Sequence, residues 1–214
     1  MAILEVKHLK QSFGDKIILN DINFSIDAGE CLGVVGKSGC GKSTLAKIIA
    51  RFIPADGGEI FLDGQNITNT KNLKSVYKNM QMIFQLPEES FDPRKTLGWS
   101  IAEPLRNFKF ENIDARTKNL LAEVGLTPDF VEKYPHEVSG GQCQRAAIAR
   151  AISISPKLLI CDEATSALDV TTQAQIINLL NKLRNEKKIA MLFITHDLKL
   201  VEKICDKVLK LENK

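Results

Sequence analysis

One short stretch, GKSGCGKST at residues 36–44, constrains the fold of this chain more than any other feature. An apolar run, CLGVV, precedes it, and a run with helical spacing, LAKIIARF, follows it. Residues 36–43 therefore match the pattern GxxxxGK[ST] in the strand–loop–helix context that the pattern requires. Glycines let the backbone curl so that N–H groups point inward, and the start of the next helix adds unpaired N–H groups. The stretch predicts a phosphate-binding loop.

The residue types of this loop indicate a nucleotide bound with Mg²⁺. Lys42 can reach the β- and γ-phosphates, and the Ser43 hydroxyl can ligate Mg²⁺. The alternative is a glycine-rich turn that contains Lys-Ser by chance, and the matching flanks disfavour it. We expect the whole loop to contact the nucleotide: Gly36, Lys37, Ser38, Gly39, Cys40, Gly41, Lys42, Ser43 and Thr44.

A second motif, LLICDE at residues 158–163, is an apolar run that ends in two carboxylates. Asp162, at the end of the expected strand, suits a role in holding Mg²⁺ directly or through water. Glu163 could polarise a water molecule for attack on the γ-phosphate. The alternative, a strand that simply ends in a polar turn, is disfavoured by the phosphate loop in the same chain.

The order of the elements indicates an α/β fold with a parallel sheet. Strands are expected at 30–35, within 76–84, at 157–161 and at 189–194, with helices at 43–52 and 174–183. Two regions differ. EVKHLKQSF and ILNDINFSI, separated by Gly14-Asp15-Lys16, predict antiparallel strands joined by a turn. Residues 86–155 show mostly helical patterns, broken by Pro87, Pro93, Pro104, Pro128 and Pro135.

We therefore expect one domain over residues 1–214. Its catalytic core, with an antiparallel β subdomain, takes residues 1–85 and 156–214, and residues 86–155 form an inserted helical subdomain. The net charge of +3 is too small to indicate a nucleic-acid partner. The five cysteines form no CxxC pair, which favours reduced thiols over zinc or disulfides. No run approaches the roughly 18 apolar residues of a membrane span, and the start lacks the order of a secretory signal.

The segment VSGGQ, at residues 138–142, lies between the two nucleotide motifs. Ser139 is expected to cap the helix that follows, and local physics alone would favour a plain cap. The segment nevertheless resembles the LSGGQ signature of ATP-binding cassette (ABC) proteins, with Val138 in place of Leu. That family implies a P-loop NTPase core of the RecA-like type with an N-terminal antiparallel β subdomain and an inserted helical lobe.

Other motifs of the ABC family follow in order, over about residues 3–211. Gln85 resembles the Q-loop glutamine, SALD at 166–169 the D-loop, and His196 the switch histidine. Phe13 stands where the family places an aromatic ring that stacks on adenine. The resemblance implies ATP and Mg²⁺ as ligands. The implied catalytic residues are Glu163, His196 and Gln85, and the implied Mg²⁺ ligands are Ser43, Gln85 and Asp162.

In ABC proteins the signature of one subunit covers the phosphate loop of another, head to tail. The resemblance therefore implies that a single chain cannot complete its own site. The resemblance adds four residues to the expected nucleotide contacts of the loop: Ser139, Gly140, Gly141 and Gln142.

Residues 85–105, QLPEESFDPRKTLGWSIAEPL, resemble the cassettes of peptide and nickel importers, which read close to QDPxxSLNPRxTVGxxIAEPL. YPHE at 134–137 is also similar, whereas Leu86 and Phe91-Asp92 depart from the pattern. This resemblance implies a second ABC ATPase subunit, two membrane permease subunits and, indirectly, a solute-binding protein as partners. It also implies a place on the cytoplasmic face of the membrane and a cargo of peptides or nickel complexes.

Three alternatives stay open. Compact ABC ATPases also do mechanical work in lipoprotein release or cell division, although the IAEPL segment argues against them. Non-transport ABC ATPases of DNA repair or translation usually carry coiled-coil insertions or a second cassette, and this sequence shows neither. The third alternative is a nucleotide-regulated binding module with negligible hydrolysis.

Overall fold

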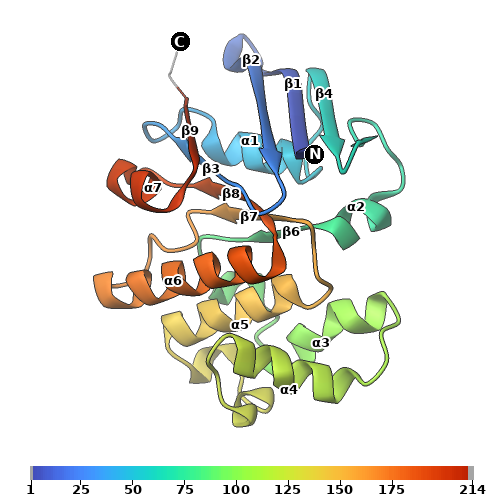
Figure 1. The fold of residues 1–214 in the computed structure, drawn as a ribbon, viewed down its shortest axis with the longest axis vertical. Coiled ribbons are helices and arrows are strands. Elements are labelled where there is room, and N and C mark those ends of the chain that lie inside the picture. Colours follow the sequence, from blue (N-terminus) through green and yellow to red (C-terminus); the bar gives the residue numbers. More distant parts are fainter. Residues whose placement is uncertain (1, 212–214) are drawn as a thin grey trace. The chain divides into compact units, whose positions relative to one another are not determined.

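A computed structural model of the chain describes residues 2–211 (Figure 1). Internal packing divides these residues into two compact units. Unit 1 holds the residues up to Met82, Lys157–Glu163 and the residues from Leu183 onward, and unit 2 holds Ile83–Pro156 and Ala164–Lys182. The helical subdomain expected at 86–155 lies within unit 2, which also takes in residues 164–182.

A parallel sheet provides the frame for the phosphate loop. Among residues 2–211 its strand order is β6-β7-β8-β3-β9, and β8 and β9 both pair in parallel with β3. Every residue of β3, β7 and β8 is buried, as expected for strands covered on both faces. The strands are β3 (Cys31–Val35), β6 (Met80–Ile83), β7 (Leu158–Asp162), β8 (Ala190–Ile194) and β9 (Lys207–Lys210).

The predicted N-terminal hairpin is confirmed and belongs to a second, antiparallel sheet. β1 (Ala2–Phe13) and β2 (Lys16–Asp27) pair across a turn in which Gly14 adopts φ 56°, a left-handed conformation that glycine accepts readily. β4 (Gly57–Leu62) pairs with β1, and β5 (Gln65–Asn66) pairs with β4.

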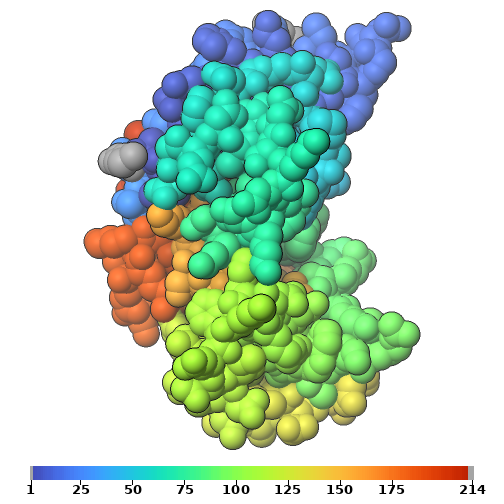
Figure 2. All heavy atoms as spheres, turned by 90° about the vertical axis from the view of Figure 1, so that its right-hand side faces the viewer, coloured from blue at the N-terminus to red at the C-terminus, as the bar shows by residue number. Residues whose placement is uncertain are grey.

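Helix α1 (Lys42–Ile49) links the two sheets of unit 1 into one core. Its fully buried Leu45 and Ile48 share a hydrophobic cluster with Val6 of β1, Val34 of β3 and Leu192 of β8. Unit 1 also contains α2 (Leu73–Asn79) and α7 (Leu198–Ile204). Side chains from β4 to α2 make up much of the face of unit 1 turned to the viewer in Figure 2. This α/β core with an antiparallel β subdomain confirms the predicted fold class.

Unit 2 is built mainly of helices. α3 (Leu97–Asn107), α4 (Ile113–Glu123) and α5 (Gly140–Ile152) pack against one another, and α6 (Val170–Lys187) begins in this unit. Short 3₁₀ turns also belong to this unit: η1 (Glu88–Ser90) precedes α3, and η2 (Pro128–Val131) and η3 (Pro135–Glu137) lie between α4 and α5. None of the helices formed by residues 2–211 combines the length and hydropathy that crossing a lipid bilayer requires.

Several expected boundaries were wrong. The strand expected within 76–84 is confirmed as β6 and starts at Met80, because α2 runs to Asn79. The helix expected at 174–183 is longer at both ends, and α1 stops at Ile49 rather than at Phe52. Pro104 does not break its helix, since α3 continues through it to Asn107. The completely buried stripe Leu97, Ile101 and Leu105 holds this helix in place against the local propensity of proline.

Candidate functional site

The loop at residues 36–41 connects β3 to α1, as the sequence predicted. Gly41 precedes the first helical residue at φ 102°, and no side chain caps the helix start, so the first N–H groups of α1 can serve an external acceptor. A Cβ on Gly36 would lie 2.5 Å from the Cys40 Sγ and from the Leu211 carbonyl oxygen. Glycine is therefore required where the loop leaves the sheet.

The side chain of Lys42 folds back over this loop. Its Nζ donates hydrogen bonds to the carbonyl oxygens of Gly36 (2.9 Å) and Lys37 (3.0 Å), and the residue is only 6% exposed. A buried ammonium beside an uncapped helix start favours a multiply charged anion. The donor set of the loop fits the phosphate groups of a nucleotide.

Ser43 and Asp162 lie together at the base of the loop. The Ser43 Oγ donates a hydrogen bond to the Asp162 Oδ1 (3.2 Å). Hydroxyl and carboxylate oxygens are ligands that Mg²⁺ accepts, usually completed by waters and substrate phosphates. Within residues 2–211 no three His, Cys, Asp or Glu side chains gather as an all-protein metal site would. The pair therefore fits a Mg²⁺ ion shared with a nucleotide.

Burial raises the pKa of Asp162, and the neighbouring Glu163 adds to that increase, while the Ser43 hydroxyl opposes it. Because the folded-state pKa is the higher one, this carboxyl contributes stability at acidic pH and loses it as the pH rises through the raised pKa. A buried, charged Asp162 is thus unfavourable at neutral pH until a cation compensates it.

Asp162→Asn should therefore raise the Tm at pH 7 in Mg²⁺-free buffer, because it removes the buried charge and keeps an oxygen for Ser43. ATP hydrolysis should be lost in the same variant, since Asn ligates Mg²⁺ more weakly. Thermal unfolding with chelator and a phosphate-release assay measure the two effects. Asp15→Asn, at the exposed hairpin turn, is the matched control. A lower Tm for Asp162→Asn than for the parent chain would contradict this.

Glu163 and His196 follow the ends of the adjacent strands β7 and β8. The His196 Nδ1 lies 3.8 Å from the Glu163 Oε1, and the two side chains are 64% and 20% exposed. The backbone N–H of Glu163 donates to the Ile194 carbonyl oxygen (3.0 Å), which ties the two strand ends together. The parallel order β7-β8-β3 thus brings Asp162, Glu163 and His196 to the sheet edge that carries the phosphate loop.

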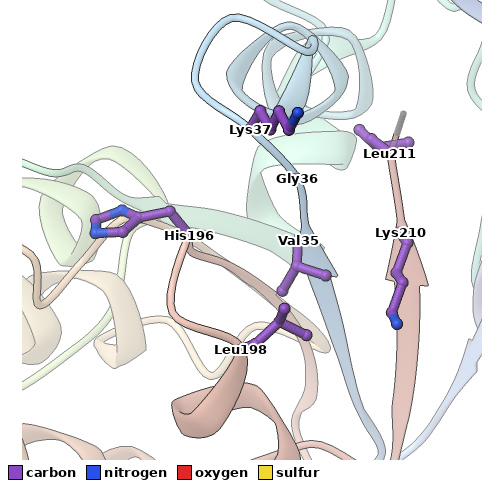
Figure 3. Close-up of a pocket in the computed structure, with 7 residues that line it drawn as sticks. All are labelled: Val35, Gly36, Lys37, His196, Leu198, Lys210 and Leu211. Carbon is purple, nitrogen blue, oxygen red and sulfur yellow. The ribbon is translucent and has the colours of Figure 1, made fainter. Parts of the chain in front are cut away.

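A cavity of about 600 Å³ borders this edge in unit 1 (Figure 3). Val35 and Leu198 point toward each other across it, and His196 lies on the loop before α7. Sequence reasoning missed Lys210 and Leu211 as neighbours of the loop, because β9 reaches β3 only through the sheet topology. It also missed Leu198, the first residue of α7. The cavity is lined by Val35, Gly36, Lys37, His196, Leu198, Lys210 and Leu211.

Two further predicted residues lie elsewhere on the chain. Phe13 ends β1 beside the hairpin turn and is 55% exposed, which leaves its ring face accessible. Gln85 is exposed and belongs to unit 2, just after β6. Their contacts with a nucleotide or Mg²⁺ stay predictions.

The segment at residues 138–142 opens α5 in unit 2, and the predicted cap is confirmed. The Ser139 Oγ accepts a hydrogen bond from the Gln142 backbone N–H (3.3 Å), and the Gln142 Oε1 accepts one from the Ser139 N–H (3.0 Å). This reciprocal capping box fixes the two side chains at the helix start. Asp169 accepts from the Thr172 N–H (3.0 Å) near the start of α6 in the same unit.

Comparison with known families decides what this arrangement is. A family model described as ABC transporter matches residues 19–166. The chain belongs to the ABC transporter family. It is an ABC ATPase domain, and its ligands are ATP and Mg²⁺.

The curated and solved relatives of this ABC domain agree. It is 45% identical to the oligopeptide transport ATP-binding protein OppF of Haemophilus influenzae, over 97% of this chain and 68% of that protein. The structure of cbiO1 from Clostridium perfringens, part of the ABC transporter complex cbiONQ, matches with a TM-score of 0.90, 29% identity, and coverage of 99% of this chain and 85% of that one. A dimeric ATP-binding cassette in a post-hydrolysis state with ADP and Pi matches with a TM-score of 0.85, 28% identity, and coverage of 98% and 94%.

Gly141 of the ABC signature lies where only glycine fits. A Cβ there would lie 2.4 Å from the Thr172 Cγ2, whereas one on Gly140 would lie 3.8 Å from the Leu168 Cδ2. Gly141→Ala should therefore destabilise the chain by about 1–3 kcal/mol, as overpacking does, and Gly140→Ala should have a much smaller effect. Denaturant unfolding measures both. Adding Thr172→Ser removes the clashing methyl group and should recover most of the loss; no recovery would contradict the clash.

Arg150, which sequence reasoning missed, holds the segment after Gln85 against the signature helix. Its guanidinium donates to the Ser90 carbonyl oxygen (2.6 Å) and Oγ (2.9 Å) and lies 4.4 Å from the centroid of the Phe91 ring. Burial lowers its pKa. A charged residue inside the run AAIARAI was the available signal. Arg150 thus links the segment that follows Gln85 to helix α5.

Proposed function

We propose that the chain is the ATP-hydrolysing subunit of an ABC importer that energises the uptake of peptides through partner permease subunits. The observation that carries this proposal is the 45% identity, over 97% of the chain, to an oligopeptide transport ATP-binding protein. The segment at residues 85–105, with its resemblance to peptide and nickel importers, supports the same assignment.

In the proposed mechanism the loop of residues 36–44 binds the phosphate groups, and Lys42 neutralises charge on the β- and γ-phosphates. Ser43, Asp162 and Gln85 hold the Mg²⁺ ion. When bound, Mg²⁺ offsets the negative charge that develops on the phosphate oxygens during transfer. Phe13 provides a ring on which adenine can stack.

Glu163 is the proposed general base. Its carboxylate accepts a proton from the attacking water, and its left-handed backbone (φ 49°) marks the point where the chain leaves the extended geometry of β7. His196, 3.8 Å away, donates a hydrogen bond to the γ-phosphate and helps to orient that water. Their positions after the adjacent strands β7 and β8 allow the two residues to act on the same water molecule.

We infer that unit 2 supplies its part of the site to another chain. In this arrangement Ser139, Gly140, Gly141 and Gln142 face the γ-phosphate bound by the loop of a partner subunit. The dimeric state of the related cassette bound to ADP and Pi supports it. Loss of the γ-phosphate contacts would release the pair, an order switch driven by one phosphate group.

The proposed partners are a second ABC ATPase subunit, two permease subunits and, indirectly, a solute-binding protein. The proposed place of the chain is the cytoplasmic face of the membrane, where residues 85–94 contact a permease. In this proposal residues 1–85 and 156–214 form the catalytic core, and residues 86–155 form the helical subdomain. No nucleic-acid partner is proposed.

Uptake measurements test the cargo. A source strain whose chain carries Glu163→Gln should lose uptake of radiolabelled oligopeptides, and affinity purification of the parent chain should recover permease subunits. Loss of ⁶³Ni uptake with normal peptide uptake would identify nickel complexes, rather than peptides, as the cargo. Recovery of ribosomes, DNA or lipoprotein-release subunits, with normal uptake of both cargoes, would overturn the importer assignment.

A further inference from the structure

Two cysteines of unit 1 lie together away from the nucleotide residues. Cys31 begins β3, at the end opposite to the phosphate loop, and Cys205 follows the last residue of α7. Their Sγ atoms are 3.2 Å apart. Cys31 is buried and Cys205 is partly exposed, so Cys205 is the more accessible residue of the pair. The proposed ATPase mechanism uses neither residue.

Backbone hydrogen bonds hold the two cysteines in this position. The Asp206 N–H donates to the Cys31 carbonyl oxygen (2.8 Å), and the Cys31 N–H donates to the Asp206 Oδ2 (2.8 Å). Arg184 fixes that carboxylate through its Nη1 (3.0 Å). The Cys205 N–H completes α7 by donating to the Val201 carbonyl oxygen (2.9 Å). The sulfur atoms therefore meet on a rigid frame.

Gly33 allows this close approach of α7 to β3. A Cβ at this position would lie 2.2 Å from the Val201 Cγ1 and 3.1 Å from the Cys205 Sγ. Any other residue would push the end of α7 away from the strand. The thiol pair thus depends on a glycine two residues beyond Cys31.

We propose that Cys31 and Cys205 are a redox modification site. Low-molecular-weight disulfides such as oxidised glutathione oxidise the two thiols, which then form a reversible disulfide with each other. The link would join the start of β3, which carries the phosphate loop at its other end, to the end of α7, which follows His196.

The chemistry runs in two exchanges. Cys205 loses its proton, and its thiolate attacks one sulfur of the reagent; a mixed disulfide forms, and the released reagent thiolate takes up a proton. Cys31 then loses its proton and attacks the Cys205 Sγ, which breaks the mixed disulfide and releases the second reagent thiol. Two cysteine thiols are oxidised, one reagent disulfide is reduced to two thiols, and two protons pass to the reagent.

The order of the two steps follows from the environment of each thiol. The hydrogen bond with Cys205 and burial raise the pKa of Cys31, so its thiolate is scarce and inaccessible to a bulky reagent. The second exchange is intramolecular and starts from sulfur atoms already in contact, which gives it a large effective concentration. Cys205 is therefore the thiol that attacks the reagent first, and Cys31 resolves the mixed disulfide.

The test uses the purified full chain, treated with oxidised glutathione and then analysed by intact mass and by thiol titration in denaturant. The treated chain should lose two of its five titratable thiols, retain no glutathione and yield a Cys31–Cys205 linked peptide. Dithiothreitol should restore all thiols. The Tm of the oxidised chain should rise by roughly 5–15 °C, because the link closes a long loop of the unfolded chain.

Single variants separate this site from general thiol reactivity. Cys31→Ser should stop at one glutathione on Cys205, and Cys143→Ser, which removes a buried cysteine of unit 2, should still form the link. The proposal is overturned if the folded parent chain keeps five thiols, ends as a stable glutathione adduct, or links through cysteines other than this pair. Circular dichroism confirms that each variant is folded before oxidation.

Discussion

Glu163→Gln should slow ATP turnover by a factor of about 10²–10⁴, the usual contribution of a general base, and should leave the affinity for Mg-ATP unchanged. Gln has nearly the same shape as Glu but cannot take a proton from water. The local frame should survive, because the hydrogen bond from the backbone N–H of residue 163 to the Ile194 carbonyl oxygen does not involve the side chain. Steady-state phosphate release and equilibrium dialysis with labelled ATP measure the two quantities.

The matched control for this variant is Glu202→Gln, an exposed residue of α7 in the same unit. It should hydrolyse ATP at the parent rate. If Glu163→Gln also kept the parent rate, the assignment of the base would be wrong; if it lost ATP binding instead, Glu163 would have a structural role.

Lys42→Ala should weaken Mg-ATP binding about 100-fold, which corresponds to roughly 2.7 kcal/mol of lost charge-assisted contacts. The side chain is buried and is held over the phosphate loop by the carbonyl oxygens of Gly36 and Lys37. Its removal takes away the ammonium group that these hydrogen bonds hold over the loop. Hydrolysis at subsaturating ATP should fall by at least the same factor.

Equilibrium dialysis gives the affinity of this variant, and circular dichroism shows whether it stays folded. Lys78→Ala, an exposed lysine of α2, is the control and should bind as the parent chain does. Unchanged affinity in folded Lys42→Ala would place the phosphate groups somewhere other than this loop.

The features that the sequence predicted best are those with a local physical cause. The strand–glycine loop–helix pattern at 36–44 predicted the loop geometry, because glycines at positive φ and an open helix start are properties of the segment itself. The hairpin at Gly14 and the Ser139 cap are local for the same reason. Apolar runs of strand length predicted β3, β7 and β8, since strands of a buried parallel sheet read as continuous apolar segments.

The features that the sequence did not predict depend on distant contacts. Pro104 stays inside α3 because a buried stripe outweighs its helix-breaking tendency. The cavity beside the loop requires β9 next to β3, and Arg150 finds Ser90 only in the folded unit 2. The same holds for Cys31 and Cys205, which lie 174 positions apart in the chain. Spacing along the sequence carries no signal for such pairs.

The most direct test of the central claim is equilibrium dialysis of the folded parent chain against labelled ATP with Mg²⁺. The account predicts saturable binding of one labelled ATP per chain. Unlabelled ATP should displace the label, and chelation of the metal in the Lys42→Ala variant should abolish binding. A folded chain that takes up no ATP at millimolar concentration would contradict it.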